Sequence, residues 1–258
     1  MIADEAQDFS KEEMVAITKA KKAFFDYGDS AKSIYNGVTD SATQQIKTTL
    51  TMREIGNLIN RDVDKLAFNH RLPKKIARFA ALIGEGDDMP ILESICREEG
   101  SELPHIDQYS SHDEELNAIH TIIERRHFED VGVLFPTSAE VERAYKFFKN
   151  KGLNIEAKYE DKENWRKSKM DLDFSPTNTN PKLMTYHSAK GLQFEAVFLP
   201  NCHARRPNDR PVLYVAITRS YQSLYISHTG QPSPFFDAIP TSLYQTGSPV
   251  VSDKDITI

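Results

Sequence analysis

Three carboxylates stand within five positions near the start of this sequence, in the run Asp4-Glu5-Ala6-Gln7-Asp8. They follow a short apolar lead and precede a stretch with helical spacing. Two adjacent acids at the end of a strand can hold Mg²⁺ through one carboxylate and orient an attacking water with the other. Asp4 and Glu5 have this spacing. The same acids also suit a plain helix entry, where they face the positive end of the helix dipole.

The composition is that of an ordinary globular protein. The 258 residues suffice for one large or two ordinary domains, with 39% hydrophobic and 27% charged residues. A net charge of −6 means that any nucleic-acid site would be a local surface. Cys96 and Cys202 form neither a disulfide framework nor a zinc signature, which favours a reducing cytoplasm. No run of 18 apolar residues occurs, so we expect no contact with a membrane.

Helices and short strands alternate along the chain. Helical spacing begins after the acids and recurs in 48–59, from Pro73, around 116–123 and in 138–152. Strands are predicted at "AFFDY", at Lys65–Phe68, and at "DVGVLFP", "KLMTYH", "AVFLP" and "SLYISH". The polar stretches "EGDD" and "REEGSELP" within 85–104, and residues 160–181, are predicted to be loops. The tail from Gly230 is predicted to run over the surface apart from "PFFDAIP". This alternation predicts an α/β protein with a parallel sheet covered by helices on both faces.

Five segments carry a resemblance to a known family. In order they are "DEAQD" at 4–8, "GDSAKSIY" at 28–35, "FNHRLPKKI" at 68–76, "TYHSAKGLQFEAVFLP" at 185–200 and "LYVAITRS" at 213–220. Together they resemble the motifs that follow the Walker A loop in UvrD/Rep-type DNA helicases of superfamily 1. The late segment "PSPFFDAIP" is similar to the end of many such proteins.

The resemblance implies RecA-like domains of the P-loop NTPase type, with ATP bound between two of them. It assigns residues 1–45 to the end of the first domain, 46–229 to the second, and 230–258 to a Pro/Ser-rich tail. Only 114 positions separate Arg71 from Thr185, so we expect no large inserted subdomain.

The resemblance also implies catalytic roles. Asp4 would hold Mg²⁺ and Glu5 would activate water. Arg71 and Arg219 match two arginines that the family directs at the γ-phosphate of ATP, where a fixed positive fork stabilises phosphoryl transfer. Without the resemblance, each arginine would be an ordinary surface or salt-bridge residue.

Four residues correspond to nucleotide contacts, and three of them depart from the family pattern. Lys32 stands in place of a glutamine, His70 in place of an adenine-stacking tyrosine, and Gln193 in place of a ribose-binding glutamate. Gly191 allows the backbone to approach a nucleotide closely.

Three further residues point to single-stranded DNA. Thr185 and His187 can donate hydrogen bonds to phosphates. Tyr35 matches an aromatic residue near bound DNA in the family, where stacking tolerates any base; a core aromatic is the alternative. Gly37 stands where a second stacking residue is common, which predicts a weaker grip on the strand.

The sequence lacks a phosphate-binding loop of the form GxxxxGK[ST], and none of its glycines precedes a lysine. We therefore predict the C-terminal part of an ATP-dependent helicase or translocase, inactive as an ATPase by itself, whose Walker A half lies upstream of Met1. A degenerate, non-catalytic module that binds nucleic acid or a protein is the alternative. A metal-dependent nuclease using Asp4, Glu5 and Asp8 is a third hypothesis.

Overall fold

A parallel sheet forms the centre of the protein. The computed structural model describes residues 2–20, 25–26, 28, 32–34, 46–62, 64, 68–85, 89–160 and 169–247. Within these residues the main sheet has seven strands, in the spatial order β3 (His105–Tyr109), β9 (Ser220–Thr229), β8 (Phe194–Leu199), β4 (Val131–Phe135), β7 (Lys182–Thr185), β5 (Glu156–Tyr159) and β6 (Lys169–Asp171). Neighbouring strands are parallel except β6, which pairs antiparallel with β5 at one edge.

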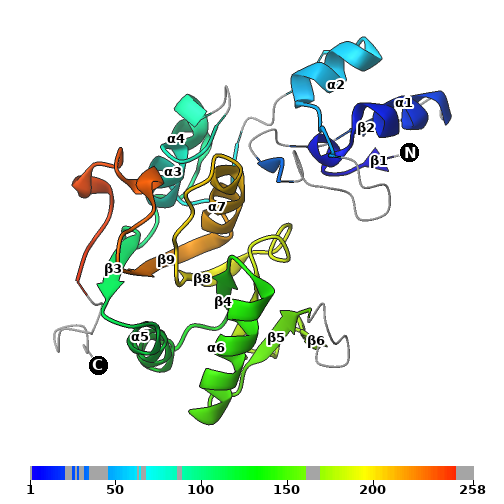
Figure 1. Ribbon diagram of the computed structural model, residues 1–258. Helices are drawn as coiled ribbons and strands as arrows, with labels where there is room; N and C mark the ends of the chain where they lie inside the picture. The colour runs from blue at the N-terminus through cyan, green and yellow to red at the C-terminus, as the bar shows by residue number, and fades with distance from the viewer. Residues whose placement is uncertain are drawn as a thin grey trace.

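Helices cover both faces of this sheet, as Figure 1 shows. One face carries α3 (Lys74–Ala81), α4 (Leu92–Ile95) with the short η3 (Met89–Ile91), and α7 (Asp209–Ile217). The other carries α5 (His112–Arg126) and α6 (Ser138–Asn150). Each face therefore buries its own hydrophobic core, because strands buried on both sides need apolar side chains pointing both ways. The predicted α/β class with a RecA-like parallel sheet is confirmed.

Local sequence explains these elements well. β4 reads Val-Gly-Val-Leu-Phe and is buried throughout. At Gly132 a side chain would collide with the Phe194 ring, 2.6 Å from an added Cβ, so the glycine allows β4 and β8 to pack closely. Helix α6 begins in a capping box, in which Thr137 and Glu140 each accept from the other's backbone N–H.

Three strands depart from the predicted pattern. β6 lies within 160–181, which was predicted to be a loop; that prediction is wrong at Lys169–Asp171. β3 and β5 were not predicted: β3 is rich in polar residues, and β5 has only four residues, so its alternation of polar and apolar side chains is a weak signal. The expected strand at 65–68 falls outside the described residues except for Phe68.

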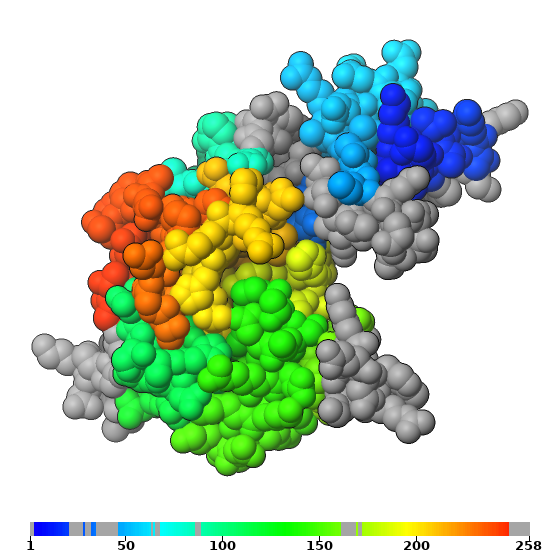
Figure 2. Space-filling model, in the orientation of Figure 1, coloured from blue at the N-terminus to red at the C-terminus, as the bar shows by residue number. Residues whose placement is uncertain are grey.

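The N-terminal elements form a small lobe beside the main sheet, visible in Figures 1 and 2. β1 (Ile2–Ala3) pairs parallel with β2 (Phe25–Asp26), and the lobe also contains η1 (Ala6–Asp8), α1 (Lys11–Ala20) and α2 (Met52–Ile59). Ala6, Met14 and Ile55 form its core. The domain boundary at residues 45 and 46 stays a prediction; side chains from both sides of it share this core.

The tail after β9 packs on α3 through its apolar stretch. η5 (Pro234–Phe236) and η6 (Thr241–Leu243) lie here. Phe236 is buried with its ring centre 6.1 Å from that of Phe79, and the backbone of Gln245 accepts from Ile106 at 2.9 Å. Phe236 and Ile239 belong to the apolar stretch "PFFDAIP", which the prediction set apart, and they complete the core beneath α3. Residues 241–247 are exposed or half-buried, as predicted for the rest of the tail. In the described part of the chain, every helix is too short or too polar to cross a membrane.

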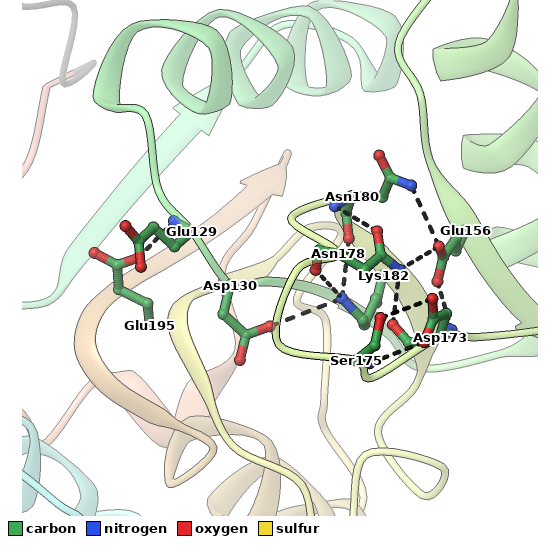
Figure 3. A network of polar contacts seen from close by, with 9 residues as sticks. All are labelled: Glu129, Asp130, Glu156, Asp173, Ser175, Asn178, Asn180, Lys182 and Glu195. Atoms are coloured by element: carbon green, nitrogen blue, oxygen red, sulfur yellow. Dashed lines mark hydrogen bonds and ion pairs between the residues drawn. The ribbon is translucent and has the colours of Figure 1, made fainter.

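A buried lysine secures the edge of the sheet where its strands begin (Figure 3). Lys182, at the start of β7, donates to the carbonyl of Asn180 at 3.1 Å and lies 4.0 Å from the carboxylate of Asp130. Glu156 accepts from the side chain of Asn178 and from the backbone of Asp173. These contacts fold the segment 173–180 back onto β5 and β7.

Candidate functional site

The acids at the start of the chain form a tight turn after β1. Glu5 adopts the left-handed conformation, with φ of 54°, which is uncommon for a residue with a side chain. Its N–H donates to Asp4 Oδ1 at 2.9 Å, and the N–H of Asp8 donates to the carbonyl of Glu5 at 2.9 Å. The Asp4 side chain is exposed, whereas Glu5 and Asp8 are half-buried. Burial raises the pKa of Asp8, although the neighbouring Lys190 opposes this rise.

A second turn follows β7 and contains Thr185, His187 and Gly191. The Thr185 hydroxyl donates to Ser188 Oγ at 3.1 Å and accepts from the Ser188 N–H at 3.2 Å. Lys190 N–H donates to the carbonyl of His187 at 3.2 Å. Gly191 has φ of +83° with open space where a Cβ would stand, so its backbone conformation, and not crowding, requires glycine.

Lys190 joins these two turns. Its ammonium donates to Asp8 Oδ2, lies 3.5 Å from Glu5 Oε2, and donates to the carbonyl of Lys32 at 3.1 Å. No role was predicted for Lys190 from the sequence. Its position immediately before Gly191, within one of the recognised motifs, was the only available signal.

Two open hollows lie at the carboxyl ends of β4 and β7, where ligands bind in open parallel sheets. The first, of about 460 Å³, is lined by Asp4, Glu5, Asp8, Lys158, His187, Ser188, Lys190 and Gly191. The second, of about 570 Å³, is lined by Pro136, Thr137, Ser138, Ala139, Glu142, Glu160, Thr185 and His187. His187 belongs to both. The structure thus brings predicted acids and predicted DNA contacts to neighbouring hollows.

The two predicted arginines line neither hollow. Arg71 is exposed, at the turn before α3, where Asn69 Oδ1 accepts from its backbone N–H at 2.9 Å. Arg219 is buried: its guanidinium donates to the carbonyls of Val215 at 2.9 Å and Leu192 at 3.1 Å, and to the hydroxyl of Thr218 at 3.1 Å. These bonds tie the end of α7 to the segment before β8. The roles of both arginines as phosphate ligands stay predictions.

Apart from Gly191, the other predicted nucleotide residues line neither hollow. His70 is exposed, and its ring lies edge-on to the exposed Phe68 at 6.4 Å between ring centres. The guanidinium of Arg97 lies 3.8 Å from the centre of the same Phe68 ring. Gln193 is half-buried just before β8, and Lys32 meets Lys190 through its backbone carbonyl. Tyr35 lies outside the described residues, as does Gly37.

The side chains that line the first hollow suit Mg²⁺ better than they suit the phosphates of a nucleotide. Mg²⁺ is commonly held by one or two carboxylates together with waters and substrate phosphates, and the exposed carboxylate of Asp4 fits that use. Among the described residues, however, no group of three His, Cys, Asp or Glu side chains is arranged to hold a metal unaided. A nucleotide also needs a cradle of backbone N–H groups, and the sequence contains no phosphate-binding loop.

Comparisons with known proteins point in the same direction as the motifs. Residues 182–227 match the UvrD-like helicase C-terminal domain. The chain is 36% identical over 104 residues to the ATP-dependent DNA helicase PcrA of Staphylococcus aureus strain Mu50, an alignment that covers 30% of this chain and 14% of that protein. PcrA of Staphylococcus epidermidis is 35% identical over 99 residues, covering 28% and 14%. The match therefore spans a small part of these relatives.

A solved structure supports the fold alone. The C-terminal domain of a possible DNA helicase from Lactobacillus plantarum aligns with a TM-score of 0.51 at 19% identity. The alignment covers 69% of this chain and 98% of that domain.

Proposed function

We propose that this chain, which carries a UvrD-like helicase C-terminal domain over residues 182–227, is the C-terminal motor portion of an ATP-dependent DNA helicase or translocase. One observation carries the proposal. The acids Asp4 and Glu5 share a hollow with His187 and Gly191 of the matched segment, although more than 180 positions separate them in the sequence. A nucleotide site beside a DNA-binding turn is what a motor requires.

The acidic turn supplies the hydrolytic groups. ATP with Mg²⁺, when bound, provides the phosphoanhydride bond that is cleaved. Asp4, exposed to the hollow, would hold Mg²⁺ directly or through its waters. Glu5 accepts from the side chain of Gln7 and lies near Lys190, so its carboxylate is held in place to orient the attacking water.

The second hollow offers a place for a single strand of DNA. The N-terminus of the 13-residue helix α6 lines it, and helix N-termini favour phosphate. His187 also lines this hollow and can donate to the same backbone, whereas the one hydroxyl donor of Thr185, at the hollow's edge, is used by Ser188 until that bond is exchanged for a phosphate. The carboxylates of Glu142 and Glu160 also line this hollow and oppose phosphate, which agrees with a weak grip on DNA by this portion alone.

The test compares two proteins. We expect the 258-residue chain to show no ATPase activity with or without oligodeoxythymidylate. The natural protein extended to include a Walker A loop should hydrolyse ATP in a DNA-stimulated way, and Glu5→Gln in that protein should reduce kcat by about a thousandfold or more. If the extended protein hydrolyses no ATP, or Glu5→Gln leaves kcat unchanged, the motor proposal fails.

A second candidate is a non-catalytic helicase-like module that binds nucleic acid or a protein. The departures at Lys32, His70 and Gln193 favour it, as does the engagement of the Arg219 guanidinium with oxygens of the protein itself. Sequencing the coding region upstream of Met1 separates the two: an in-frame GxxxxGK[ST] favours the motor, and a stop codon favours the module.

A further inference from the structure

Lys190 connects three segments that are far apart in the sequence. Its ammonium donates to Asp8 Oδ2 and to the carbonyl of Lys32 at 3.1 Å, and lies 3.5 Å from Glu5 Oε2. Only 9% of its side chain is exposed. An ammonium has three donors, and three acceptor oxygens surround this one, two from the acidic turn at 4–8 and one from Lys32. Water and salt weaken such a buried contact less than they weaken a surface ion pair.

Each end of this link belongs to a turn closed by backbone hydrogen bonds. On one side, Lys190 is bonded through its backbone to His187, and Ala189 to Thr185, so the ammonium moves with the residues that face the DNA hollow. On the other side, the backbone of Asp8 is bonded to that of Glu5. The second carboxylate oxygen, Asp8 Oδ1, is buried without a hydrogen-bond partner among the described residues. Asp8 is therefore held chiefly through Lys190.

We propose that Lys190 is a positioning residue that sets the place of Glu5 and Asp8 according to the state of the turn at 185–191. The path from His187 through Lys190 to Asp8 and Glu5 consists of direct contacts. A strand of DNA that displaces the turn would therefore displace the carboxylates. The response to DNA rests on the proposed function, whereas the link between the turn at 185–191 and the carboxylates rests on the contacts alone.

Hydrogen exchange on the full 258-residue chain, without ligand, tests the link. Lys190→Met should speed amide exchange in peptides from residues 2–10 by roughly tenfold, because the turn loses its anchor. Lys158→Met is the matched control: Lys158 lines the same hollow but forms no ion pair with a described carboxylate, and its loss should leave these peptides unchanged. Peptides from 131–135 report whether each variant is folded.

Asp8→Asn distinguishes a specific pair from a general effect of charge. Asp8→Asn by itself should speed exchange at 2–10 as much as Lys190→Met does. The variant that carries both substitutions should exchange no faster than either single variant, since each substitution removes the same contact. Additive effects, equal acceleration in Lys158→Met, or no acceleration in Lys190→Met would each overturn the link.

A second measurement adds a 16-nucleotide oligodeoxythymidylate. In the wild type, the oligonucleotide should slow amide exchange at 185–191 and also change the exchange rate at 2–10. In Lys190→Met, exchange at 185–191 should still slow, but the rate at 2–10 should no longer change. A change at 2–10 that persists in the variant contradicts the proposal. If the oligonucleotide does not bind the wild type, the proposed DNA contact fails, and the ligand-free exchange still decides the link.

Discussion

The ammonium of Lys182 lies 3.1 Å from the carbonyl oxygen of Asn180, although the lysine is only 1% exposed. A buried lysine is costly unless its charge is matched. Here Asp130 is 4.0 Å away and the Phe174 ring centre 5.5 Å away. Lys182 thereby secures the returning segment 173–180 against β5 and β7, as Figure 3 shows.

Lys182→Met should lower the free energy of unfolding by about 2 kcal/mol, because the carbonyls of Asn178 and Asn180 lose a buried donor. Lys146→Met is the control: that lysine is 66% exposed and paired with Glu142 on the surface, so its loss should cost less than about 0.5 kcal/mol. Urea denaturation measures both. Equal effects would show that the burial of Lys182 contributes nothing.

Glu102 predicts a specific loss of stability in acid. Burial by itself raises the pKa of Glu102, but the nearby side chains of His105 and Ser223, the ion pair with Arg126 at 2.9 Å and the hydrogen bond from the Tyr225 hydroxyl at 3.0 Å outweigh it and lower the pKa to about 2. Because this pKa lies below its ordinary value of 4.5, the stabilisation is complete above pH 4.5 and disappears as the pH falls toward 2.

Glu102→Gln should remove that dependence and cost about 3 kcal/mol at pH 7. Thermal unfolding between pH 2 and 7 provides the measurement. Glu124→Gln, on the exposed surface of α5, should leave the acid profile of the wild type intact. A Glu102→Gln protein that still loses the same stability between pH 4.5 and 2 would refute the assignment.

Alanine substitution of Arg71 and of Arg219 should lower the free energy of unfolding by different amounts. Arg219→Ala removes a buried guanidinium that donates to three oxygens and should cost on the order of 3 kcal/mol. Arg71→Ala, at an exposed position, should cost less than about 0.5 kcal/mol. A loss of ATPase in Arg71→Ala of the extended protein would therefore report chemistry, whereas the same loss in Arg219→Ala needs correction for folding. Equal stabilities of the two variants would contradict the buried role of Arg219.

His187 should contribute to DNA affinity. His187→Ala should weaken binding of a fluorescent oligodeoxythymidylate by roughly fivefold, the value of one hydrogen bond to phosphate. His127→Ala, at the exposed C-terminal end of α5, should bind like the wild type. Fluorescence anisotropy at fixed salt measures both, since phosphate contacts depend on salt. Unchanged affinity in His187→Ala would remove this residue from the DNA surface.

The sequence by itself determined the class of fold and the helicase resemblance. Buried strands such as 131–135 and capped helices such as α6 follow from local pattern and propensity, and five short motifs kept their order. It missed β3, which is rich in polar residues, and the short strands β5 and β6, whose four and three residues alternate too briefly to mark a strand. Those strands form because the backbones of neighbouring strands offer hydrogen bonds. The neighbouring strands are distant in the sequence, so local pattern does not reveal the pairing.

Only the tertiary structure decided what the charged residues touch. Arg71 and Arg219 look alike in the sequence, yet one is exposed and the other is buried among oxygens of its own chain. Lys182 and Lys190 received no role from the sequence and proved to be buried anchors. The reason is physical: a residue type sets how many hydrogen bonds a side chain can form, whereas burial and partners depend on segments that are distant in the sequence.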